Sequence, residues 1–116
     1  MEYWFRAKRL SDNQWEYGGV DDKSSSIIAH YQFIPIDPDT LGLHTGAHDV
    51  HLCGIYHGDI LRFWVNGKRL LIVIQWDGWR FAISIHENSE TSKFPKKFSF
   101  EDGKIVGNLW DGIQEN

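Results

Sequence analysis

Apolar residues between Asp59 and His86 fall into three runs along the chain. The dipeptides Asn66-Gly67 and Asp77-Gly78 separate these runs, and both tolerate the positive φ angles of tight hairpin turns. Apolar runs of this length bounded by such dipeptides are typical of β-hairpins. The pattern therefore predicts a meander of three antiparallel strands at about residues 60–86.

The turn residues also predict the register of this meander. If each turn is a two-residue loop, Val65 faces Lys68 in the first hairpin and Ile74 faces Phe81 in the second. Successive side chains of a strand alternate between faces, so one face is almost entirely apolar. This predicted core face carries Leu61, Phe63, Val65, Leu70, Ile72, Ile74, Trp76, Trp79, Phe81, Ile83 and Ile85.

The opposite face of the meander is mixed in character. It carries Ile60, Arg62, Trp64, Arg69, Leu71, Val73, Gln75, Arg80, Ala82, Ser84 and His86. Aromatic residues and arginine concentrate in binding hot spots, so Arg62, Trp64, Arg69 and Arg80 form a candidate patch for binding a partner. Packing of Trp64 within the domain is the plainer alternative.

The segments before the meander show weaker strand and turn signals. Tyr3–Lys8 and Trp15–Val20 are aromatic runs on either side of a polar turn, which predicts an N-terminal hairpin. We expect one further strand over Ile27–Ile34, which must stop near Pro35. Asp37-Pro38 is then expected to cap a single helical turn, because Asp accepts from unpaired N–H groups and Pro suits the first helical position.

A third hairpin is predicted after the meander. Phe98–Phe100 and Lys104–Trp110 flank Asp102-Gly103, another turn dipeptide. No segment shows a sustained apolar period of 3.6 residues, and no linker divides the chain. We therefore expect an all-β fold with little helix, built as a single domain of residues 1–116. Its strands would form a compact barrel-like structure or packed antiparallel sheets.

Composition narrows the classes of function. The chain has 116 residues, of which 41% are hydrophobic and 15% aromatic, as expected of a globular β protein. Twelve Lys and Arg against sixteen Asp and Glu give a net charge of −4, which works against capture of nucleic acid. A single cysteine forms no intramolecular disulfide, and neither a signal segment nor a membrane-spanning apolar run of about 20 residues is visible. We expect a cytoplasmic protein without membrane association.

Several short motifs, taken in order, resemble those of the YopX family of phage and prophage proteins. They are Phe5-Arg6-Ala7, Trp15-x-Tyr17-Gly18, Asp37-Pro38-Asp39-Thr40-Leu41-Gly42, Thr45-Gly46, Ile55-Tyr56-x-Gly58-Asp59-Ile60, Val73-Ile74-Gln75-Trp76 and Val106-Gly107-Asn108-Leu109. The resemblance implies a single YopX-like domain that associates into oligomers, with no established activity to carry over. We expect structural roles, mainly in turns, for the motif residues Asp37, Pro38, Thr45, Gly46, Tyr56, Gly58, Asp59, Gly107 and Asn108.

A histidine-rich segment is the strongest candidate for chemistry. It contains His44, His48, His51, Cys53 and His57, with Asp49 and Asp59 interleaved. These side chains are of the kinds that bind zinc, but the spacing lacks a tight ligand pair, and three glycines break any helix that could align them. Members of the YopX family also commonly carry non-ligands at His48, His51 and Cys53. We therefore expect loop histidines without a metal or another cofactor.

Signatures of catalysis are also missing from the sequence. No serine lies in a nucleophile elbow, no phosphate-binding loop occurs, and Asp59 has no inferable acid or base partner. The leading hypothesis is a non-enzymatic phage or prophage accessory protein that self-associates and binds a host or phage protein. One alternative is a small β-barrel that binds nucleic acid through Arg62, Arg69 and Arg80. The other is a metal-dependent enzyme that uses the histidine-rich segment.

Overall fold

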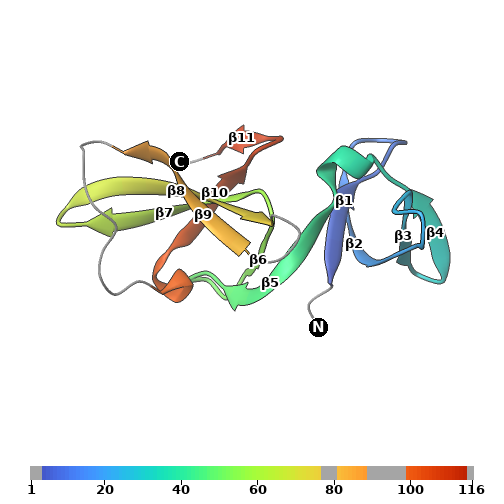
Figure 1. The fold of residues 1–116 in the computed structure, drawn as a ribbon, viewed down its shortest axis with the longest axis horizontal. Coiled ribbons are helices and arrows are strands. Elements are labelled where there is room, and N and C mark those ends of the chain that lie inside the picture. The colour runs from blue at the N-terminus through green and yellow to red at the C-terminus, as the bar shows by residue number, and fades with distance from the viewer. Residues whose placement is uncertain (1–3, 77–80, 89–98, 115–116) are drawn as a thin grey trace. The chain divides into compact units, whose positions relative to one another are not determined.

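The computed structural model describes residues 4–76, 81–88 and 99–114. The chain divides into two compact units, Met1–His44 and Thr45–Asn116, which we call unit 1 and unit 2. Strand β5 (Gly42–His48) is the element in which the chain passes from one unit to the next (Figure 1). The division into two compact units does not show that either unit folds by itself. The single domain of residues 1–116 therefore stays a prediction.

Unit 1 is an antiparallel sheet in which the strands follow the order β4-β3-β2-β1-β5. Its strands are β1 (Phe5–Lys8), β2 (Trp15–Val20), β3 (Ser26–Ala29) and β4 (Gln32–Pro35), together with the first residues of β5. The N-terminal hairpin is confirmed, with Phe5 opposite Gly18 and Lys8 opposite Trp15. Ala7, Ile27 and Ile36 form the buried core of this unit.

The prediction of one strand over Ile27–Ile34 is wrong. The segment forms two strands, β3 and β4, and Ile28 lies opposite Phe33. His30 and Tyr31 connect them with φ angles of 53° and 61°, the left-handed conformation of a tight hairpin turn. Asn-Gly is typical of such a turn, whereas His and Tyr are not, so the sequence did not predict a turn here. The strand does end at Pro35, as predicted.

The helical turn after Asp37 is confirmed. Element η1 (Pro38–Thr40) is one turn of 3-10 helix, and the Asp37 carboxylate accepts a hydrogen bond of 3.0 Å from the Asp39 N–H. The buried Thr40 hydroxyl donates to the Asp37 carbonyl at 2.7 Å and accepts from the Lys8 N–H at 2.8 Å. These bonds attach the turn to β1, so the motif has a structural role in unit 1.

Unit 2 contains a five-stranded antiparallel sheet with the order β11-β10-β7-β8-β9 (Figure 1). Its strands are β7 (Asp59–Val65), β8 (Lys68–Trp76), β9 (Phe81–Asn88), β10 (Lys104–Asn108) and β11 (Gly112–Ile113). The predicted three-strand meander is confirmed as β7, β8 and β9. Strand β6 (Gly54–Tyr56), which the sequence did not predict, pairs with β5.

The register is confirmed in the first hairpin and wrong in the second. Val65 lies opposite Lys68, as predicted, but Ile74 lies opposite Ile83 and not Phe81. The apolar pattern cannot distinguish registers that differ by two residues, because such a shift leaves every side chain on its own face. Residues 77–80, which include the predicted core residue Trp79 and the predicted site residue Arg80, lie outside the described residues.

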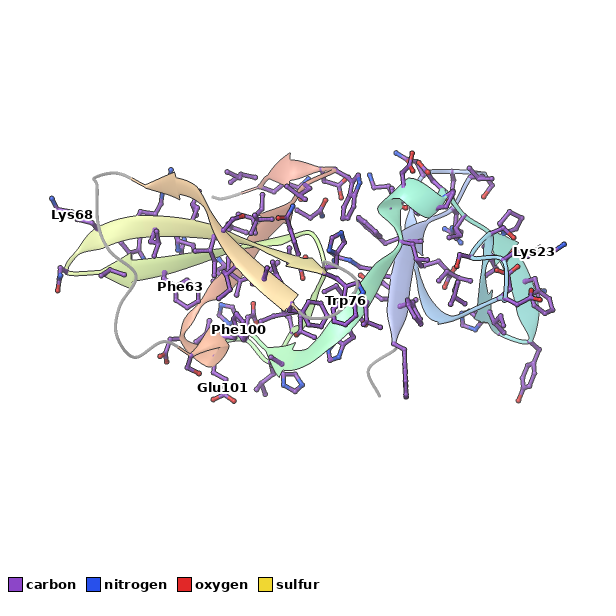
Figure 2. The ribbon with its side chains drawn as sticks, viewed as in Figure 1. Lys23, Phe63, Lys68, Trp76, Phe100 and Glu101 are labelled. Carbon is purple, nitrogen blue, oxygen red and sulfur yellow. The ribbon has the colours of Figure 1, made fainter. Side chains whose placement is uncertain are left out.

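The core face packs against a second layer made by β5 and β6. Its buried residues are Leu61, Phe63, Leu70, Ile72 and Ile74, joined by Ile55 of β6, and the partly buried Ala47, Val65, Phe81, Phe100 and Ile105 pack around them. Phe63 and Phe100 both point into this core (Figure 2). The far end of the predicted face is less buried, with Trp76 37% and Ile83 38% exposed.

These contacts confirm the all-β class with packed antiparallel sheets. In the described part of the chain, helix is limited to the single turns η1 and η2 (Phe100–Asp102).

The prediction of a third hairpin with its turn at Asp102-Gly103 is wrong. Asp102-Gly103 does not connect two strands: η2, capped by Ser99, ends there, and β10 pairs with β7 and β11. Gly103 has an ordinary φ of −96°. A Cβ atom at Gly103 would lie 2.4 Å from the ring of Phe63, so the glycine allows close approach to the core and does not serve a hairpin turn.

Candidate functional site

Four side chains define one surface of unit 2, which we call the Trp64 face: Arg62, Trp64, Arg69 and Lys104. Arg62 and Trp64 are two residues apart on β7 and therefore share a face. Trp64 lies opposite Arg69 on β8, and Arg62 lies opposite Lys104 on β10. Directly opposed residues of antiparallel strands point to the same side, so the register places all four side chains together.

Trp64 is the most accessible member of this surface. Its side chain is 62% exposed, so it does not belong to a core, contrary to the alternative of intramolecular packing. The Arg62 guanidinium carbon lies 5.5 Å from the centre of the Trp64 ring, in the range of a cation–π contact. This contact leaves an indole that is oriented by a cation and still largely open to solvent.

The Trp64 face changes in character along the strands. Beyond Arg62, the same side of the sheet carries Ile60, Leu71, Val73 and Val106, which form a buried apolar cluster. The cationic and aromatic part lies toward the tip of the β7–β8 hairpin, from which Lys68 projects (Figure 2). Lys68 is opposite Val65 and therefore belongs to the other face.

The structure brings together three of the four predicted patch residues and adds one. Arg62, Trp64 and Arg69 share the face, whereas Arg80 lies outside the described residues. Lys104 was missed because its pairing with Arg62 joins segments far apart in the sequence. No local pattern around Lys104 signals that neighbour.

The histidine-rich segment does not form one loop, contrary to expectation. His44 and His48 lie within β5, His51 and Cys53 lie between β5 and β6, and His57 lies between β6 and β7. Thr45 and Gly46 were also expected in a turn, but they lie inside β5, where Gly46 has a φ of 85°. Within the described ranges, no group of three or more His, Cys, Asp or Glu side chains is placed to hold a metal ion.

Asp49 organises the segment between β5 and β6. One carboxylate oxygen accepts the N–H groups of His51 and Cys53, both at 2.9 Å, and the other accepts the Ile105 N–H at 3.0 Å. The side chain is 3% exposed, and its oxygens satisfy backbone donors that would otherwise be buried without acceptors. Asp49 therefore attaches the loop to β10 and has a structural explanation.

Cys53 is exposed at the end of this loop. Desolvation of its thiol raises its pKa above the ordinary value, and the neighbouring Asp49 and Asp59 carboxylates raise it further. The raised pKa keeps the thiol protonated at neutral pH. Because the thiolate is the reactive form, this environment is the opposite of one that activates a nucleophilic cysteine.

Five of the motif residues meet where the β6–β7 turn lies beside the end of β10. Asp59 pairs in register with Asn108, and Gly107 pairs with Ile60. The buried Asp59 carboxylate accepts the Tyr56 N–H at 2.8 Å, which closes the turn. Gly58 has a φ of 92° there.

Close packing explains the glycines at this junction. A Cβ atom on Gly58 would lie 2.2 Å from the Trp110 ring, and one on Gly107 would lie 2.0 Å from the Gly112 carbonyl oxygen. Asn108 accepts the N–H groups of Trp110 and Asp111 at 3.0 and 2.8 Å and so shapes the β10–β11 turn. These contacts favour structural roles for the motif residues.

His57 also belongs to this junction. Its Nδ1 accepts the Trp76 N–H at 2.7 Å, and its ring lies 5.9 Å from that of Trp110. The nitrogen that faces Trp76 is therefore occupied by a backbone donor and does not serve as a metal ligand in this arrangement.

No helix in the described residues is long and apolar enough to cross a membrane.

Comparison with known proteins identifies no relative of this chain. Neither a family model, nor a curated protein, nor a solved structure matches the sequence or the fold.

Proposed function

We propose that this chain is a non-enzymatic β domain that self-associates and binds another protein, and that the Trp64 face forms both contacts. The observation that carries the proposal is the 62% exposed Trp64 side chain beside Arg62 and opposite Arg69. Trp and Arg are the residues that most often contribute the largest share of binding energy at protein interfaces. An exposed indole held by a neighbouring cation is also already ordered, which lowers the entropic cost of binding.

The proposal includes the origin and location of the protein. The order of its short motifs supports an accessory protein of a bacteriophage or prophage, acting in the cytoplasm of the bacterial host.

Trp64→Ala tests the role of the face. We expect the variant to self-associate about 30-fold more weakly, because truncation of a hot-spot residue costs about 2 kcal/mol or more. Sedimentation velocity over a concentration series measures this change, and circular dichroism reports whether the β structure is retained. Phe33→Ala is the matched control, since Phe33 is 67% exposed on β4 of unit 1.

Two outcomes would contradict the proposal. Self-association of Trp64→Ala equal to that of Phe33→Ala would show that the Trp64 face is not the interface between copies. Loss of the circular dichroism signal in Trp64→Ala would show that the indole supports the fold and would remove the observation on which the proposal rests.

Binding of nucleic acid is the second candidate. The favouring observation is the same exposed Trp64 beside cations, because an aromatic ring on a basic sheet can stack a nucleotide base. Titration with single- and double-stranded oligonucleotides at low salt tests it. Affinity that falls steeply with ionic strength would support this candidate, and absence of binding at low salt would remove it.

A further inference from the structure

We infer that Asn66-Gly67 is a site of spontaneous deamidation, and that the isoaspartate formed there opens the tip of the β7–β8 hairpin. The sequence contains this Asn-Gly dipeptide once. It forms the whole two-residue turn between Val65, where β7 ends, and Lys68, where β8 begins. The inference goes beyond the proposed function and does not depend on it.

The reaction needs only the chain itself and water. The backbone nitrogen of Gly67 attacks the Cγ carbonyl of Asn66, so that an N–Cγ bond forms, the bond from Cγ to the side-chain nitrogen breaks, and ammonia leaves with the Gly67 amide proton. Water then opens the resulting succinimide ring at either carbonyl. Opening at Cγ gives aspartate. Opening at the main-chain carbonyl gives isoaspartate, in which the main chain runs through Cβ and Cγ.

The surroundings of the turn leave the reacting atoms accessible. Asn66 and Gly67 are both exposed, and a Cβ atom on Gly67 would meet no atom within 4 Å. Glycine carries no side chain that hinders ring closure at its nitrogen. Among the described residues no hydrogen bond holds the Asn66 side chain, so its amide can rotate toward Gly67.

The closed turn slows the reaction without preventing it. Asn66 has a φ of 53° and Gly67 a φ of 76°, as in a type I′ turn. That conformation directs the Gly67 nitrogen away from the Asn66 side chain, so the turn must open before the ring closes. Exposed loop tips open at a low cost in free energy. We therefore expect slower conversion than in an unstructured peptide of the same sequence.

Two other asparagines provide internal controls. Asn13 is also exposed and has a φ of 61°, but Gln14 follows it. Asn108 is buried, and its side chain accepts the N–H groups of Trp110 and Asp111. Because Asn13 matches Asn66 in exposure and in φ, the comparison of these two isolates the effect of the following residue.

Isoaspartate does not suit this turn. Its main chain is longer than that of an ordinary residue, whereas aspartate before glycine is as typical of the turn as asparagine. The longer loop no longer fits the register in which Val65 lies opposite Lys68, and the next pair along the hairpin is Trp64 with Arg69. The conversion therefore alters the end of the hairpin that carries the Trp64 face.

Incubation of the full chain at mildly alkaline pH, followed by peptide mapping with mass spectrometry, tests the site. We expect the mass increase of an exchange of NH2 for OH at Asn66, at least about tenfold faster than at Asn13 or Asn108. The rate should rise with pH, because the attacking nitrogen reacts as its anion. Asn66→Asp has no amide to lose and should show no mass change in this peptide.

Two outcomes would overturn the deamidation site. One is conversion at Asn66 that is no faster than at Asn13. The other is an unconverted Asn66 in the full chain under conditions that convert a free peptide of residues 62–70.

Hydrogen–deuterium exchange tests the opening of the hairpin tip. The isoaspartate form is separated by chromatography and identified by methylation with an isoaspartate-specific methyltransferase. We expect the amides of Val65 and Lys68 to exchange at least about tenfold faster in this form than in the unconverted chain. Exchange at the buried Ile72 should stay unchanged, as should exchange at all three positions in Asn66→Asp. Equal exchange at Val65 and Lys68 in the isoaspartate form and in Asn66→Asp would overturn this part of the inference.

Discussion

The two faces of the β7–β8 hairpin are built from alternating residues of the same strands, yet they differ in their accessibility. On the core face, Leu61, Phe63 and Ile72 are at most 5% exposed and belong to one buried cluster with Ile55 of β6, against which Ala47 of β5 and Phe100 of η2 pack. On the Trp64 face, Arg62 is only partly buried, and Trp64 is 62% exposed. The difference shows which residues folding requires and which ones are available for binding.

Ile72→Ala would have the largest effect on this comparison. Ile72 is fully buried at the centre of the core face, so its truncation leaves a cavity and should lower the free energy of unfolding by about 2–5 kcal/mol. Urea titration followed by circular dichroism measures the change. Arg69→Gln on the opposite face is the control and should shift stability by less than about 0.5 kcal/mol. Similar losses in both variants would show that the two faces do not differ in their importance for folding.

Asp49→Asn tests how the second layer is held over the core face. The substitution removes one of the two acceptor oxygens and presents an amide donor to backbone N–H groups. We expect a loss of about 1–3 kcal/mol in the free energy of unfolding, also measured with urea. Asp102→Asn, at an exposed carboxylate of η2, should be nearly neutral. A neutral Asp49→Asn would show that the loop needs no carboxylate.

The smallest effect is expected at Cys53, and it is chemical. Since the pKa of its thiol is raised by desolvation and by the Asp49 charge, the thiolate forms only at higher pH than in an unstructured peptide. The rate of alkylation by iodoacetamide, measured against pH, should therefore have its midpoint above that of a short cysteine peptide. Asp49→Asn should move the midpoint down. A midpoint below that of the peptide would contradict the described environment of the loop.

Local patterns predicted a large part of the fold. The Asn66-Gly67 turn and its flanking apolar residues specified the first hairpin with its register, and Asp37-Pro38 specified a capped helical turn. These features depend on residues within a few positions of each other. The prediction from sequence was wrong at His30-Tyr31, because this tight turn is formed by residues that are not typical of turns. It was also wrong in the register of the second hairpin, because a shift of two residues leaves every side chain on the same face of the sheet.

The candidate site was partly predictable, because part of it also depends on residues that are close together in the sequence. Alternation along β7 and β8 placed Arg62, Trp64 and Arg69 on one face, because strand neighbours and hairpin partners follow from short spacing. Lys104 joined them only through the pairing of β10 with β7. Asp49 likewise resembled a metal ligand in the sequence, and only its bonds to three backbone N–H groups revealed a structural role.

The sequence by itself determined that this protein is all-β, that residues of about 60–86 form a meander, and which side chains share each face of the first hairpin. Periodicity and turn chemistry act over short distances, so they can be read along the chain. Only the tertiary structure decided which face is covered. Burial depends on which distant segments pack against a strand, and here residues of β5, β6 and η2 pack on the core face while Trp64 stays accessible.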